Sequence, residues 1–112
     1  MTVLGAALAA TLVFAAAPVA AAQDQDNTTL SQWLKSCQGN RQACLTDLSY
    51  GYEAAYMDMD EICPPSGLSE ATATEKEMEW LENSAAYNSG MAAGKKLDAE
   101  WTALHVLWPC SR

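Results

Sequence analysis

A chain of 112 residues, half of them apolar, is long enough for one small domain and too short for two hydrophobic cores. Fourteen acidic residues against six basic ones give a formal net charge of −8, which excludes nucleic acid as a target. Such a surface speeds association with a basic protein, although acidity is also common in exported proteins that bind nothing in particular.

The first 22 residues carry no charge, consist mostly of Ala, Leu and Val, and end in three alanines before the polar stretch QDQDN. This pattern predicts a secretory signal peptide cleaved after Ala22, followed by a single domain over residues 23–112. The basic residue that usually opens such a signal is missing. A membrane anchor is the alternative, but the small residues at the cleavage position and a length at the short limit of ~20 residues for a span favour removal. We therefore expect a periplasmic protein with no membrane segment after cleavage.

All cysteines lie in the predicted mature part, and their number is even: Cys37, Cys44, Cys63 and Cys110. An even count behind an export signal predicts two disulfides formed in an oxidising compartment. A zinc site competes with this interpretation, but the chain has no C-x2-C pair and its single histidine, His105, is not spaced from a cysteine as zinc modules require. We expect neither a metal nor a cofactor.

Two helices are predicted in the first part of the mature chain. The first lies in the segment TTLSQWLKSC and begins after polar residues that can cap a helix. Its apolar residues fall at helical spacing and are Leu30, Trp33, Leu34 and Cys37. The second has a buried stripe that steps by four, four, three and four: Cys44, Leu48, Tyr52, Ala55 and Met59. Gly51 weakens this helix slightly and can permit close packing. The segment CPPSG then stops it, because two prolines exclude further helix and Gly67 can adopt a conformation closed to other residues.

Two more helices are predicted after this turn. The third begins at Ser69 or at Thr72, which with Glu75 fits a capping box, and it ends near Asn88. Its predicted buried face consists of Thr74, Met78, Leu81 and Ala85. The fourth runs until Pro109, and its predicted buried stripe consists of Ala93, Leu97, Trp101, Leu104 and Trp108.

These elements predict an all-α fold, a small up-down bundle of about four helices stapled by two disulfides. The layout also selects the disulfide pairing. Cys44 opens the second helix and Cys63 lies beyond its end, so at ~1.5 Å per residue they are roughly 25 Å apart, far beyond the ~4.4 to 6.8 Å that a disulfide allows between Cα atoms. Cys37 and Cys44 meet at one end of the bundle. Cys63 and Cys110 both follow helices that finish at the other end, which gives the second pair.

No catalytic set is evident in the sequence. The segment around Asp47 loosely resembles the helix of small secreted phospholipases, but the histidine of their His-Asp pair is missing. His105 lies on a crowded apolar helix, where a packed or helix-end histidine is more usual than a catalytic base. Two acidic pairs, Asp58 with Asp60 and Glu77 with Glu79, have i, i+2 spacing, which does not converge on one helical face and indicates solvated surface. We expect no enzyme activity.

The motifs taken together resemble a known family, the periplasmic immunity proteins that neutralise type VI secretion amidase effectors, called the Tai/Rap group. The likeness rests on the cysteine that ends the first helix, the cysteine that opens the second, the turn CPPSGLS at residues 63–69, the pair Trp80-Leu81 and the ending Leu107-Trp108-Pro109-Cys110. The chain departs from the family pattern after Cys44, where Asp47 and Tyr50 stand in place of an aromatic residue and a glycine. It also lacks the His-Pro that commonly follows the aromatic-leucine pair.

The resemblance implies a binding function. Members of this family are small helical proteins, often homodimers, that occlude the active-site cleft of a peptidoglycan amidase, so the expected partner is a cognate amidase effector. An alternative is a periplasmic acid-stress chaperone or another exported helical binding protein. A chaperone of that kind would loosen at low pH, whereas an immunity protein would stay folded and bind one partner tightly.

The partner surface is predicted at the stapled corner around the CPPSG turn, where the acidic residues are densest. The corner is held rigid by two prolines and a disulfide, so presenting it to a partner costs little ordering entropy. The predicted partner-binding residues are Asp58, Asp60, Glu61, Glu70, Glu75, Glu79 and Glu82.

Overall fold

The computed structural model describes residues 27–111, so the predicted signal peptide lies outside the described part of the chain. The secondary-structure elements of these residues are helices, with no strand among them, which confirms the all-α class. They are α2 (Leu30–Cys37), α3 (Arg41–Glu53), the π-helix η1 (Ala54–Asp58), α4 (Glu70–Tyr87), the short α5 (Ser89–Ala93) and α6 (Lys96–Leu107). No helix of residues 27–111 is both long enough and apolar enough to cross a membrane.

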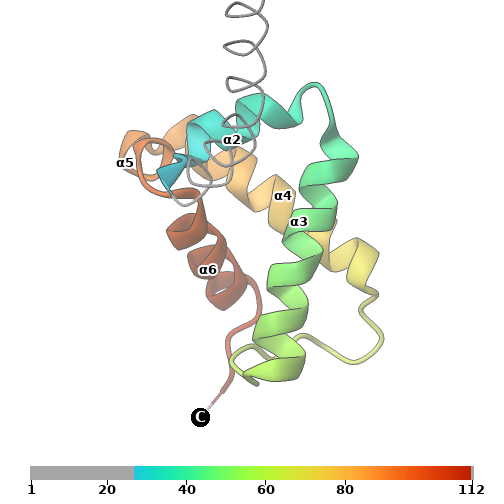
Figure 1. The fold of residues 1–112 in the computed structure, drawn as a ribbon. Coiled ribbons are helices and arrows are strands. Elements are labelled where there is room, and N and C mark those ends of the chain that lie inside the picture. Colours follow the sequence, from blue (N-terminus) through green and yellow to red (C-terminus); the bar gives the residue numbers. More distant parts are fainter. Residues whose placement is uncertain (1–26, 112) are drawn as a thin grey trace, which may run out of the picture.

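Helices α3 and α6 descend in the same direction, and α4 returns behind α3, as Figure 1 shows. The eight-residue α2 lies across the upper ends of these three helices and contacts α3, α4, α5 and α6. Two backbone hydrogen bonds hold its start against the turn before α6, from Leu30 N to Gly94 O at 2.9 Å and from Lys96 N to Thr28 O at 2.9 Å. Only α3, α4 and α6 therefore follow the predicted up-down order, because α2 is too short to run beside them.

Polar side chains begin most of the helices by accepting hydrogen bonds from backbone N–H groups that have no partner within the helix. Thr29 and Gln32 form a reciprocal capping box at the start of α2, and Asn40 caps α3. The third predicted helix is capped by Ser69, whose Oγ accepts from Thr72 N at 3.1 Å. The Thr72–Glu75 capping box is not formed, because Thr72 lies inside the first turn and the Glu75 carboxylate is engaged by Arg41 instead.

The core consists of two clusters that share the inner faces of α3, α4 and α6. The upper cluster contains Leu30, Leu48, Met78 and Leu81 and the Cys37–Cys44 disulfide, and the lower one contains Tyr52, Ala55, Ile62, Leu104 and Trp108. The predicted stripe of the second helix is correct from Cys44 to Ala55 and wrong at Met59, which is 46% exposed. The π-turn causes this difference, because its wider turn rotates Met59 off the buried stripe.

The buried face of the last helix differs from the predicted stripe. Leu97 is exposed and Ala93 belongs to the separate short helix α5, whereas Lys96, Ala99, Glu100 and Ala103 are buried together with Leu104. The predicted stripe included neither Lys96 nor Glu100. They are buried because they pair with each other, which lowers the cost of removing both charges from water.

Both predicted disulfides are confirmed. Cys37 and Cys44 lie 5.8 Å apart between Cα atoms, and Cys63 and Cys110 lie 5.0 Å apart. The first joins α2 to α3 at the top of the molecule, and the second joins the chain after η1 to the chain after α6 at the opposite end. A backbone hydrogen bond from Cys63 N to Trp108 O at 2.9 Å reinforces the second junction.

Candidate functional site

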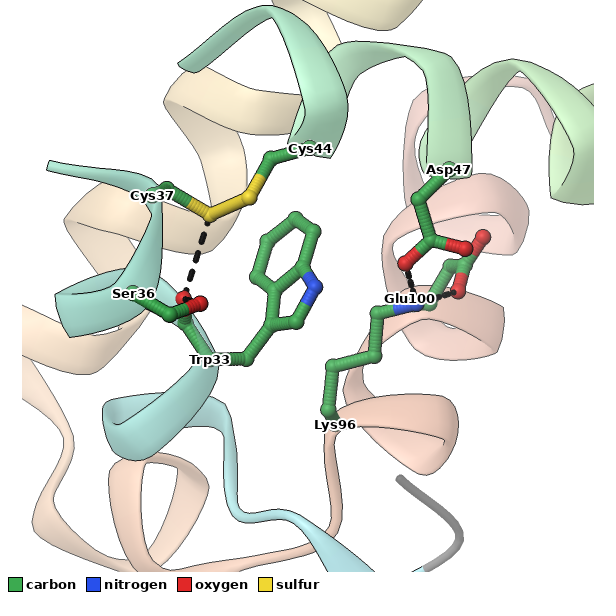
Figure 2. Close-up of polar contacts among 7 residues, drawn as sticks. All are labelled: Trp33, Ser36, Cys37, Cys44, Asp47, Lys96 and Glu100. Atoms are coloured by element: carbon green, nitrogen blue, oxygen red, sulfur yellow. Dashed lines mark hydrogen bonds and ion pairs between the residues drawn. A yellow bond between two sulfur atoms is a disulfide. The ribbon is translucent and has the colours of Figure 1, made fainter. Parts of the chain in front are cut away.

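A groove of about 940 Å³ runs between α2 and the first half of α3. Polar side chains, one indole ring and one phenol ring contribute to its wall, and the lining residues are Asn27, Thr28, Gln32, Trp33, Ser36, Ala43, Cys44, Thr46, Asp47 and Tyr50. Figure 2 shows the Trp33 indole between the Cys37–Cys44 disulfide and the side chain of Lys96. The disulfide therefore holds one wall of the groove in position.

The positively charged ammonium group of Lys96 lies behind this groove. Its Nζ donates to Asp47 Oδ2 at 2.7 Å and to Glu100 Oε1 at 2.8 Å, and it lies 4.9 Å from the centroid of the Trp33 ring (Figure 2). The side chains of Lys96 and Glu100 are 7% and 6% exposed, whereas that of Asp47 is 49% exposed and reaches the groove. These contacts join α2, α3 and α6 through one ammonium group.

Burial disfavours the charged form of Lys96, but the Glu100 and Asp47 carboxylates outweigh that effect and raise the pKa of its ammonium group. Burial also raises the pKa of Glu100, against the opposing effect of Lys96. A lysine held protonated by two carboxylates is not a nucleophile, because the neutral amine is the reactive form. The cluster therefore clamps three helices and offers a partly exposed Asp47 carboxylate for binding.

Glu77 on α4 lies near the Lys96, Glu100 and Asp47 cluster and is fully buried. Neither of its carboxyl oxygens has a hydrogen-bond partner among the described residues. Burial raises the pKa of Glu77 to about 9, and the nearby negative charge of Glu100 contributes in the same direction. The side chain is therefore neutral at pH 7. The prediction of a solvated Glu77 is wrong. The spacing contained a usable signal, because Glu77 falls between Thr74 and Leu81 on the buried face of its helix.

His105 lies at the surface in the last turn of α6. Its Nδ1 is 2.7 Å from the carbonyl oxygen of Trp101, and its Nε2 is 3.6 Å from a carboxylate oxygen of Glu61. The ring packs beside Trp101 with centroids 5.9 Å apart. This agrees with the helix-end histidine that the sequence suggested. Among residues 27–111 no group of three His, Cys, Asp or Glu residues is placed to hold a metal ion.

The structure divides the predicted acidic partner surface into separate parts. Glu75 and Glu82 on α4 pair with Arg41 at 2.9 Å and 3.4 Å, so their charges are partly compensated at the start of α3. Glu70 accepts a hydrogen bond from Ser49, and Glu79 is exposed on α4. Only three of the predicted residues lie together at the stapled corner: Asp58, Asp60 and Glu61.

The same corner exposes large apolar side chains that sequence reasoning missed. Tyr56, Met57 and Met59 are exposed within and just after η1, interleaved with the three acidic residues. Tyr56 and Met57 lie outside the predicted buried stripe, whereas Met59 lies within it, so periodicity hides the exposure of Met59 alone. Comparison of the chain with known protein families, curated proteins and solved structures gives no match.

Proposed function

We propose that this chain is a periplasmic immunity protein that binds and inhibits a secreted peptidoglycan amidase and so protects the producing cell and its kin. The observation that carries the proposal is the stapled corner. There, exposed acidic and apolar side chains stand on a turn that the Cys63–Cys110 disulfide ties to the end of the chain. A rigid surface of this kind suits an inhibitor, because little conformational entropy is lost on binding.

Two of the motifs behind the family resemblance come together at this corner, which supports the proposal. The CPPSGLS turn and the terminal Leu-Trp-Pro-Cys segment are joined by the disulfide and by the hydrogen bond from Cys63 N to Trp108 O. Gly67 has φ of 86°, a conformation that favours glycine, so this residue type is required where the turn reverses. Both motifs thus build one structural unit.

The raised pKa values of two buried carboxyl groups argue against the alternative function, an acid-stress chaperone. Such a protein should loosen as pH falls, yet Glu77 and Glu100 both have a raised pKa. A buried carboxyl whose folded-state pKa is raised destabilises the fold as pH rises, so these groups favour the folded state in acid. These two groups therefore do not supply the loss of stability in acid that such a chaperone needs.

Co-expression with the product of the neighbouring gene, which the proposal expects to be the amidase, tests the proposal. We expect a complex of fixed stoichiometry on gel filtration and loss of peptidoglycan hydrolysis when the two proteins are mixed in equal amounts. An amidase of another type should remain active and serves as the control. Full hydrolysis in the presence of excess inhibitor would overturn the proposal, as would intrinsic hydrolytic turnover that His105→Ala abolishes.

A further inference from the structure

Helix α3 ends in a π-turn, and this turn determines which side chains point outward. Met59 N donates to Ala54 O at 3.0 Å, five residues back, and Glu61 N donates to Ala55 O at 2.8 Å. The additional residue per turn moves Met59 away from the stripe that Tyr52 and Ala55 occupy. Ile62, which is 1% exposed, fills the lower core instead.

Residues 56–61, here called the knuckle, expose three large apolar side chains in a short segment. Tyr56 is 45% exposed, Met57 72% and Met59 46%. Three acidic residues alternate with them, and the segment contains no basic residue. Large apolar groups gathered on an exposed turn commonly mark a protein interaction site, and methionine suits such sites because its flexible thioether adapts to the partner.

Packed aromatic rings and a disulfide fix the position of the knuckle. Tyr56 packs beside Tyr52 with ring centroids 5.8 Å apart, and Tyr52 meets the edge of Trp108 at 5.4 Å. Cys63, two residues after the knuckle, is bonded to Cys110. The apolar side chains are therefore presented on a backbone that is already ordered before binding.

We propose that the knuckle enters an apolar cleft of the partner amidase whose rim carries Lys or Arg side chains. Met57 and Met59 fill the cleft, and Asp58 and Glu61 face the basic rim. Charge complementarity selects this occupant, because three acidic groups on the knuckle repel an acidic surface, including that of a second copy of this chain with its net charge of −8. The Glu61 carboxylate lies 3.6 Å from His105 Nε2, and the Glu61 side chain is still 48% exposed. The inference rests on the proposed function and adds which side chains carry the affinity.

The two kinds of side chain have distinct kinetic effects. Buried apolar anchors act mainly on the dissociation rate, whereas charges at a rim act mainly on the association rate and are screened by salt. We expect Met57→Ser combined with Met59→Ser to weaken binding by about 30-fold or more through faster dissociation. Asp58→Asn combined with Glu61→Gln should slow association by about 10-fold at low salt and have little effect at about 0.5 M salt.

The surface-immobilised product of the neighbouring gene, once shown to be the amidase of the proposed function, is the probe, and both rates are measured for each variant. Tyr87→Ser is the matched control, because Tyr87 is 90% exposed at the end of α4, away from the knuckle, and its loss should change affinity less than about 2-fold. Circular dichroism and the melting temperature establish that each variant is folded.

The outcomes separate the inference from the proposed function. Tight binding by the wild-type chain with unchanged dissociation of the Met57→Ser, Met59→Ser variant would overturn the inference and leave the function standing. Absence of binding by the wild-type chain would overturn both. Light scattering adds a third arm, because a dimer that the serine variant dissociates, without loss of amidase affinity, would make the knuckle a contact between copies and overturn the inference.

Discussion

Glu77 sits in the core with its carboxyl group protonated at neutral pH. Burial raises its pKa from 4.5 to about 9, with Glu100 adding to the shift, while Lys96 acts in the opposite direction. Between these two values the folded chain keeps a proton that the unfolded chain releases. The contribution of Glu77 to the free energy of unfolding is thus highest below about pH 4.5 and decreases as pH rises toward 9.

Glu77→Gln removes this dependence, because the amide keeps the shape of the protonated acid and cannot ionise. We expect the variant to melt more than about 5 °C above the wild-type chain at alkaline pH and within about 2 °C of it in acid. Calorimetry between about pH 4 and pH 9 measures the difference. Glu79→Gln on the exposed face of α4 is the control and should follow the wild type throughout. A constant difference at every pH would show that Glu77 ionises normally in the fold.

At the scale of elements, the contact between α3 and α6 depends on a residue without a side chain. A Cβ built on Gly51 would overlap Oε2 of Glu100 and lie 3.0 Å from its Cδ. Glu100 cannot easily move aside, because its other oxygen accepts from Lys96 at 2.8 Å and the side chain is buried. The close approach of the two helices and the ion pair between Lys96 and Glu100 therefore require glycine at this position.

Gly51→Ala should lower the free energy of unfolding by about 1 to 3 kcal/mol, because displacing Glu100 outweighs the roughly 1 kcal/mol that alanine adds to helix stability. Urea unfolding measures the change. Gly39→Ala is the matched control, because a Cβ at Gly39 has no atom within 4 Å. We expect that variant to change stability by less than about 1 kcal/mol in either direction. A Gly51→Ala protein as stable as the control would mean that the helices separate at no cost.

At the scale of the whole molecule, the two disulfides stabilise opposite ends by different amounts. The Cys37–Cys44 pair is separated by 7 residues in sequence and the Cys63–Cys110 pair by 47. A longer closed loop removes more conformational entropy from the unfolded chain. The second disulfide also fixes the knuckle, so it connects stability with the proposed binding surface.

Replacing Cys63 and Cys110 by serine should cost about 4 kcal/mol of unfolding free energy, against about 2.5 kcal/mol for replacing Cys37 and Cys44. The first change should also weaken amidase binding, whereas the second should leave it nearly unchanged, because Cys37 and Cys44 lie at the far end of the molecule. Denaturant unfolding and binding kinetics of both double variants test this. Equal costs for the two pairs, or an equal loss of binding, would contradict the assignment of separate roles.

Local sequence patterns were sufficient to predict the four main helices, the two disulfide pairs and the turn at Cys63 to Ser69. These features follow from local patterns, since apolar spacing, capping residues, prolines and the length of α3 each act within a few turns of the chain. The cysteine pairing was predictable because a helix of known rise separates Cys44 from Cys63, and that excludes one partner by distance alone.

The burial of charged groups and the exposure of apolar groups depend instead on how distant segments of the chain pack together. Lys96, Glu100 and Glu77 are in the interior because α2, α3, α4 and α6 meet around them, and contacts between distant segments leave no signal in local periodicity. Met59 is exposed because one π-turn changes the phase of a helix, which shifts every following side chain around the axis. The acidic residues predicted to form one patch are distributed over separate surfaces. Contacts between distant segments cause this too, because Arg41 reaches Glu75 and Glu82 only after folding.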